Sequence, residues 1–196
     1  ITLVEQGSVP GQSNTDWTSF ATLRQEATEY DNRARPEKWL LKDGGGLVQS
    51  VRQQSYDAVS NVNCVAIRMD PAVWAAQSDA CSAQTSGPYG SDRVTKFVYD
   101  AADQNTSVAT AYGSVVARVD QTMTYTNNGR LFTIKDAKNN LSTTEYDSFD
   151  RPHKMRFPLP DVPNSSSTSD YTLLSYDLAS NVTQTRQWDG SLINYA

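Results

Sequence analysis

The stretch YTNNGRLFTIKDAKNNLSTTEYDSFDR, residues 125–151, decides the fold. It opens on Tyr-x-x-x-Gly-Arg-Leu and runs through two short alternating segments separated by a polar turn at residues 136–140. The same signature then returns at residues 146–152. Alternation of apolar and polar residues predicts β-strands with one wet face. The stretch is therefore one complete sequence repeat, and the repeat is a β-hairpin.

The signature occurs six times along the chain. Each copy has a Tyr at its first position and Arg, Asn or Gln at its sixth, and Asp follows the Tyr in all copies except the fourth, which has Thr126. The signature residues are Tyr30, Asp31 and Arg35; Tyr56, Asp57 and Asn61; Tyr99, Asp100 and Gln104; Tyr125, Gly129 and Arg130; Tyr146, Asp147 and Arg151; and Tyr176, Asp177 and Asn181. Recurrence of one signature along the whole chain predicts a stacked array of repeat units.

These residues resemble the YD repeats of the Rhs family, whose common form is Tyr-Asp-x-x-Gly-Arg-Leu followed by a later Asp-x-x-Gly-Asn. The resemblance covers most of the chain, from Trp17 to Tyr195, although only the copy at Tyr125 keeps the glycine. The other copies have Ala34, Ser60, Asp103, Asp150 and Ser180 at that position. The resemblance implies an all-β fold in which hairpins wind into a curved, spiral sheet.

Each signature position suits a structural role. A hairpin of this size cannot bury its own apolar face, so the Tyr supplies a large ring that can pack on the next copy while its hydroxyl stays hydrogen-bonded. The Asp can accept hydrogen bonds from the backbone two residues on and fix the turn. The Arg lies within reach of an Asp on its own or an adjacent repeat. Because all five Asp occupy the same turn position, we favour this role over paired glycosidase carboxylates.

The whole chain, residues 1–196, is predicted to be one repeat region. Residues 1–16 are rich in Gly, Pro, Ser and Asn and indicate an irregular entry segment. Residues 70–92 form the largest insertion, and its Asp70-Pro71 start predicts a short helix to Gln77. Residues 158–170 indicate a polar loop. The chain starts without Met and stops one residue after Tyr195, which suggests a piece of a longer protein.

Composition excludes several classes of function. Seventeen basic and 22 acidic residues give a net charge of −5, which disfavours nucleic acid or an anionic membrane as a partner. No apolar run is long enough for a membrane span, and His153 is the only histidine. No nucleophile or phosphate-loop motif occurs. We expect no catalysis, no cofactor and no metal.

Cys64 and Cys81 lie 17 residues apart, one after a signature and one at the end of the insertion helix. Two cysteines alone cannot form a zinc site. Their placement leaves two alternatives open. They form a disulfide that pins the insertion to its strand, as in an exported protein, or they are two buried thiols.

The resemblance implies a secreted or cell-surface protein that forms part of the wall of a shell around a toxin. Its partners would be neighbouring repeats of the same parent chain, identical copies joined through strand edges, and an enclosed toxin domain. Two alternatives come from other classes. A self-assembling extracellular fibre would use the pairing edges of an open array. A glycan-binding module would use the chain's ten tyrosines and four tryptophans to stack on sugar rings.

Overall fold

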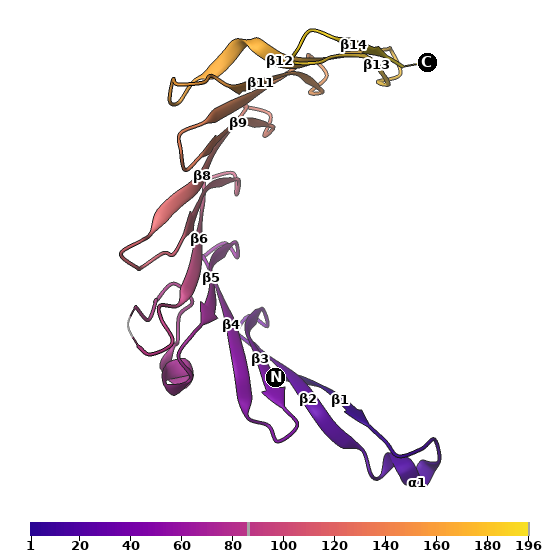
Figure 1. Cartoon of the computed structure of the whole chain (residues 1–196), viewed down its shortest axis with the longest axis vertical. Helices are drawn as coiled ribbons and strands as arrows, with labels where there is room; N and C mark the ends of the chain where they lie inside the picture. Colours follow the sequence, from indigo (N-terminus) through magenta and orange to yellow (C-terminus); the bar gives the residue numbers. More distant parts are fainter. Residues whose placement is uncertain (86, 196) are drawn as a thin grey trace. The chain divides into compact units, whose positions relative to one another are not determined.

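The computed structural model describes residues 1–85 and 87–195, and its strands follow one another in sequence order. Fourteen strands make one antiparallel sheet, ordered β1 to β14 (Figure 1). The strands are β1 (Thr2–Ser8), β2 (Ala21–Tyr30), β3 (Pro36–Asp43), β4 (Val48–Tyr56), β5 (Val62–Arg68), β6 (Arg93–Tyr99), β7 (Asn105–Thr110), β8 (Arg118–Tyr125), β9 (Leu131–Asp136), β10 (Leu141–Tyr146), β11 (Pro152–Pro158), β12 (Ser166–Tyr176), β13 (Val182–Arg186) and β14 (Leu192–Asn194). The all-β array of hairpins is confirmed.

The chain divides into two compact units. Unit 1 comprises residues 1–97 and 109–118, and unit 2 comprises residues 98–108 and everything from residue 119 onward. Unit 1 contains β1 to β5 and most of β6, whereas unit 2 contains β9 to β14 and nearly all of β8. Within each unit every strand pairs with its sequence neighbour, which is the pattern of a meander.

The sheet has little dry core. Most strand residues are half-buried, and a cluster of fully buried apolar residues forms only in unit 1, from Cys64, Ala66, Ala80 and Val94, within the described residues. This cluster lies where the insertion at residues 70–92 folds back on β5 and β6. Elsewhere the strands are held by ladder hydrogen bonds and by contacts between adjacent side chains.

The connections between strands fall into two sets. Each signature joins an even-numbered strand to the next odd-numbered strand, from β2–β3 to β12–β13. Because a meander reverses direction at every connection, the signature turns share one rim in each unit, and all other connections lie on the opposite rim. The insertion at 70–92 and the loop after β11 both lie on that second rim. The number of residues between signatures can therefore vary without changing the rim of the sheet that holds the signature turns.

Three boundaries differ from the sequence predictions. Residues 1–16 are not irregular, because β1 pairs with β2 over Thr2–Ser8 and α1 (Asn14–Trp17) follows, started by a capping box between Ser13 and Asp16. The loop after β11 ends before Ser166, where the serine-rich start of β12 pairs with Pro158. The predicted helix in the insertion is present as η1 (Pro71–Ala76), a 3-10 helix, so the described residues contain two short helices where one was predicted.

Candidate functional site

The signature turns share one backbone geometry. In the fifth copy the N–H of Asp147 donates to the carbonyl of Arg151 at 2.9 Å, and the N–H of Asp150 donates to the carbonyl of Asp147 at 3.1 Å. The same two bonds recur in the other five copies, at 2.8 to 3.2 Å. They close a three-residue hairpin loop. In such a loop a type I turn is followed by one residue in the left-handed conformation.

The left-handed residue is always the fifth of the signature. Its φ is positive in all six copies: Ala34 (59°), Ser60 (81°), Asp103 (60°), Gly129 (79°), Asp150 (58°) and Ser180 (67°). Glycine adopts this conformation without a steric penalty, which explains the glycine of the common YD form. Five of the six copies adopt it with a side chain, so other contacts must hold these turns closed.

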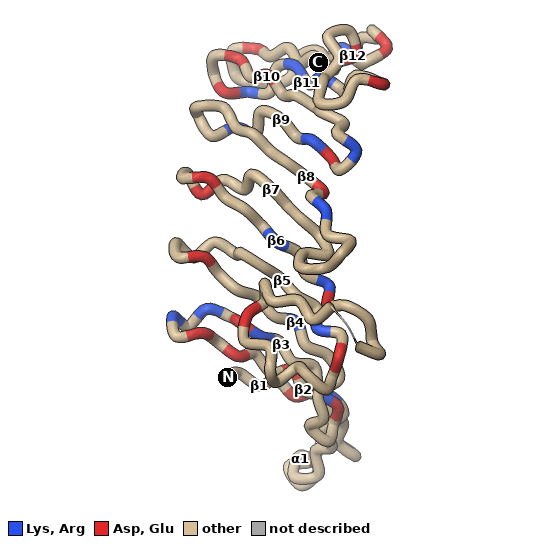
Figure 2. Tube along the Cα trace, turned by 90° about the vertical axis from the view of Figure 1, so that its left-hand side faces the viewer, with Lys and Arg blue, Asp and Glu red and all other residues tan. Residues whose placement is uncertain are grey.

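The signature aspartates provide those contacts. One oxygen of Asp147 accepts hydrogen bonds from the backbone N–H groups of Phe149 (2.9 Å) and Arg151 (3.0 Å). The other oxygen accepts from Arg151 Nε at 2.7 Å and forms an ion pair with the same guanidinium. The hydrogen bond from the Arg151 side chain is the main cause that holds the pKa of Asp147 below its usual value. Figure 2 shows acidic residues at these turns in both units.

The same carboxylate geometry holds in the other Asp copies. Asp31, Asp57 and Asp100 each accept two backbone N–H groups of their own turn, at 2.8 to 3.0 Å. Asp177 accepts from the backbone and side-chain nitrogens of Asn181, and the side-chain bond is the main cause that lowers its pKa. These are the backbone hydrogen bonds that the sequence analysis expected the signature Asp to accept.

The fourth copy departs from this pattern. Thr126 replaces Asp and accepts a hydrogen bond from the backbone N–H of Arg130 at 3.1 Å. A neutral hydroxyl cannot form an ion pair with a guanidinium, and Arg130 is exposed, with no carboxylate partner in the described part of the chain. The predicted Arg-to-Asp pairing therefore applies to Arg35 and Arg151 but not to Arg130. The fourth turn instead has Gly129 at the left-handed position.

The signature tyrosines connect successive repeats. Four of their hydroxyls, those of Tyr56, Tyr125, Tyr146 and Tyr176, donate to the backbone carbonyl of the seventh residue of the preceding signature. In unit 1, Tyr56 donates to Pro36 at 2.9 Å. In unit 2, Tyr125 donates to Asn105 (2.7 Å), Tyr146 to Leu131 (2.8 Å) and Tyr176 to Pro152 (2.7 Å). We call this series the tyrosine ladder.

The sixth-position arginines add a second link between repeats. The guanidinium of Arg35 lies 4.1 Å from the centre of the Tyr56 ring and donates to Ser60 Oγ at 2.9 Å. Arg151 has the same arrangement in unit 2. Its guanidinium lies 4.3 Å from the centre of the Tyr176 ring and donates to Ser180 Oγ at 3.0 Å. Each arginine therefore closes its own turn and reaches the next one. Cation–π contacts of this kind contribute about 0.5–1 kcal/mol at exposed sites.

Two further turns of the same geometry lie on the opposite rim. Asp43 and Asp136 accept backbone N–H groups two and four residues on, and the left-handed residues are Gly46 and Asn139. Sequence analysis recognised the turn at residues 136–140 but did not connect it with the signature, because Asp136 does not follow a tyrosine. The shared signal is Asp followed three residues later by Gly or Asn.

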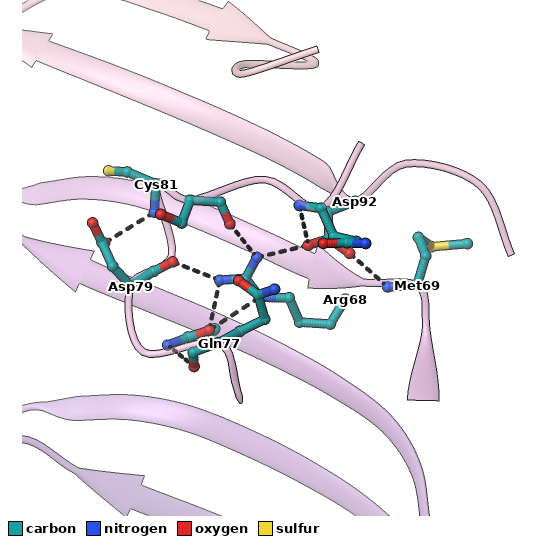
Figure 3. A network of polar contacts seen from close by, with 9 residues as sticks. Arg68, Met69, Gln77, Asp79, Cys81 and Asp92 are labelled. Atoms are coloured by element: carbon teal, nitrogen blue, oxygen red, sulfur yellow. Dashed lines mark hydrogen bonds and ion pairs between the residues drawn. The ribbon is translucent and has the colours of Figure 1, made fainter. Parts of the chain in front are cut away.

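The insertion is attached to the sheet by a disulfide and a buried polar network. Cys64 in β5 and Cys81 in the insertion are bonded to each other. Close by, the guanidinium of Arg68 is buried, with 3% of the residue exposed, and pairs with Asp92, which is 4% exposed (Figure 3). We call Arg68, Asp92 and Gln53 the insertion clamp.

Every donor of Arg68 is used. Its Nε and one terminal nitrogen donate to Gln53 Oε1 at 3.0 and 2.7 Å, and its remaining bonds reach Asp92 Oδ2 (2.7 Å) and the carbonyls of Asp79 and Ser82 (both 2.6 Å). Asp92 also accepts the backbone N–H of Met69 at 2.9 Å. A buried ion pair needs such additional hydrogen bonds to offset desolvation. Sequence analysis missed this network, although Arg68 lies just before the insertion and Asp92 is its last residue.

The described residues contain no group of three or more His, Cys, Asp or Glu side chains placed to hold a metal ion. None of the described helices is long and apolar enough to span a membrane. His153 lies in β11, where its Nδ1 is 3.2 Å from the carbonyl oxygen of Leu174. The signature carboxylates are occupied by hydrogen bonds within their own turns. The signature residues can therefore fix the register of neighbouring hairpins.

Comparison with known proteins gives only distant structural likeness. No protein-family model matches the chain, and no curated protein matches it. Among solved structures it is similar to the crystal structure of TcdB2-TccC3-Cdc42, with 14% identity over 94% of this chain and a TM-score of 0.44. It is also similar to TcdB2-TccC3 without its hypervariable C-terminal region (12% identity over 84% of this chain, TM-score 0.43) and to a mutated Tc holotoxin pore from Photorhabdus luminescens (14% over 94%, TM-score 0.42). The chain spans 10% to 12% of the length of those chains.

Proposed function

We propose that the chain is a structural wall segment of a secreted Rhs-type shell that encloses a toxin, and that it has no catalytic activity of its own. The proposal rests on one observation: the recurring polar residues form hydrogen bonds within and between the repeats. The signature aspartates close turns, and the tyrosine ladder joins one repeat to the next. Residues that align neighbouring hairpins, and that are not free for catalysis, suit a structural wall.

The Cys64–Cys81 bond supports the secreted location in this proposal. Disulfides persist in oxidising compartments and are rare in the cytosol of most cells. The small core supports a wall role as well, because a sheet whose strands are mostly half-buried gains its stability by pairing with further strands and not by packing into a globule.

The test uses the complete protein from which this wall comes. Limited proteolysis of that protein should leave an enclosed toxin domain intact, whereas the double variant Tyr146→Ala and Tyr176→Ala should expose it to the protease. The matched control is Tyr89→Ala, because Tyr89 lies in the insertion and is 57% exposed. Equal digestion of a C-terminal domain in wild type and double variant would rule out the enclosing role.

A self-assembling extracellular fibre is the second candidate, and the outermost strands favour it. β1 and β14 are the two edges of the sheet, and every residue of both is exposed. Exposed edge strands pair with other chains. Negative-stain images of the purified chain separate the two functions, because polymers that grow with concentration support the fibre and discrete particles support the wall. The glycan-binding alternative is weakened for Tyr56 and Tyr176, because the guanidinium groups of Arg35 and Arg151 already lie over their rings.

A further inference from the structure

Phe157, Asp170 and Trp188 surround a shallow hollow of about 300 Å³ in unit 2. Phe157 comes from β11, Asp170 from β12 and Trp188 from the turn between β13 and β14. Phe157 is 42% exposed and Trp188 is 63% exposed. Aromatic rings this large are seldom left in water without a role when they lie together.

A bulge in β12 places the carboxylate of the hollow. Arg156 pairs with Tyr171 and Pro158 with Ser166, so residues 167–170 have no partner opposite them in β11. Ser167 is buried, and its Oγ accepts the backbone N–H groups of Ser169 (3.2 Å) and Asp170 (2.9 Å), which fixes the bulge. Bulges re-aim side chains in this way, often next to functional sites.

Several other aromatic rings in the described part of the chain have a cation over them. A Lys or Arg lies 4.0 to 5.1 Å from the centre of each of six rings: Trp39, Tyr56, Tyr112, Phe149, Tyr171 and Tyr176. Phe157 and Trp188 have no such cation in the described part of the chain. The Asp170 side chain likewise has neither an ion pair nor a hydrogen bond among residues 1–85 and 87–195.

The cations of the neighbouring strands are engaged elsewhere. Lys154 Nζ lies 4.0 Å and the Arg186 guanidinium 4.4 Å from the centre of the Tyr171 ring. Arg156 forms an ion pair with Glu145. The hollow therefore combines two exposed aromatic rings and a carboxylate, and none of these neighbouring cations is placed to fill it.

We propose that this hollow binds a quaternary ammonium group, such as the trimethylammonium end of choline. The faces of aromatic rings carry negative charge and the carboxylate adds opposite charge, which is the chemistry by which proteins recognise such cations. A quaternary ammonium is favoured over a primary one because it has no N–H groups that need hydrogen-bond acceptors, and its methyl groups pack on ring faces. The site stands on observations separate from the wall function.

The test is a nuclear magnetic resonance titration of the intact ¹⁵N-labelled chain with choline chloride. The indole N–H signal of Trp188 is assigned by its loss in Trp188→Leu. That signal should shift saturably, with a dissociation constant on the order of millimolar because exposed cation–π contacts are individually weak. The Trp17 signal is an internal control, since Trp17 is similarly exposed but lies in unit 1.

Two comparisons isolate the charge. Asp170→Asn keeps the shape of the side chain and should weaken choline binding about fivefold or more, because it removes the opposite charge. Asp161→Asn should leave binding unchanged; it makes the same charge change at a left-handed position that Asn tolerates. The neutral isostere 3,3-dimethylbutan-1-ol should shift the Trp188 signal far less than choline. Equal shifts by both compounds, or no saturable shift at Trp188, would overturn the proposal.

Discussion

Replacing Arg68 by Met tests the insertion clamp. The substitution keeps the length of the aliphatic stem but removes the guanidinium. Asp92 then stays buried with its backbone donors Met69 and Gln84 at 2.9 and 3.1 Å and without an opposite charge. The carbonyls of Asp79 and Ser82 also lose their donor. Removing one partner of a buried ion pair costs about 3–5 kcal/mol, so we expect unit 1 to lose stability by that amount.

The matched control is Arg24→Met. Arg24 and Glu26 form an exposed ion pair, with side chains 51% and 52% exposed, and such pairs contribute about 0–1 kcal/mol. Both variants keep the disulfide, so the difference between them reports the clamp alone. Urea denaturation followed by circular dichroism, together with proteolysis of the insertion, measures the effect. If Arg68→Met lies within about 1 kcal/mol of Arg24→Met, the clamp does not hold the insertion and the reasoning fails.

Three further outcomes follow from the turns and the disulfide. Ala34→Gly should raise the free energy of unfolding by about 1 kcal/mol and Gly129→Ala should lower it by about 1–2 kcal/mol, because both positions have positive φ; thermal unfolding of the pair measures the opposite signs. The lowered pKa of Asp147 means that its contribution to stability is complete above the ordinary pKa of about 4 and is lost as the pH falls through the folded value; Asp147→Asn should therefore flatten the acid limb of stability against pH. Reducing the Cys64–Cys81 bond, whose loop spans 17 residues, should cost about 3 kcal/mol, and unfolding with and without reductant, compared with a chain carrying serine at both positions, tests this.

The signature allowed most of the fold to be predicted from the sequence. Six copies in register define which strands pair, and each copy ends one strand and begins the next. The insertion and its helix start were also predicted, because Asp70 followed by Pro71 is a local signal that acts through the N-cap hydrogen bond to Ala72. Local signals of this kind depend on neighbouring residues alone.

Features that depend on distant partners could not be predicted. The tyrosine ladder ends on backbone carbonyls, which every residue has, so no side chain marks the acceptor. β1 was predicted as irregular because its strand character comes from pairing with β2. The serines that begin β12 indicate a loop by composition, yet Ser166 meets Thr143 Oγ1 at 2.9 Å once the strands are assembled. The insertion clamp joins residues whose contact exists only after the insertion folds back.

The tyrosine ladder is the central claim, and native-state amide hydrogen exchange of Tyr146→Ala tests it most directly. The Tyr146 hydroxyl donates to Leu131, so removing the side chain should lower protection in β10 and β11 and also in the preceding signature turn, at residues 125–131. Because the ring is half-buried, we expect a loss of about 2–3 kcal/mol in both places. Loss of protection confined to β10 and β11, with the preceding turn unchanged, would contradict the claim that the tyrosines join successive repeats.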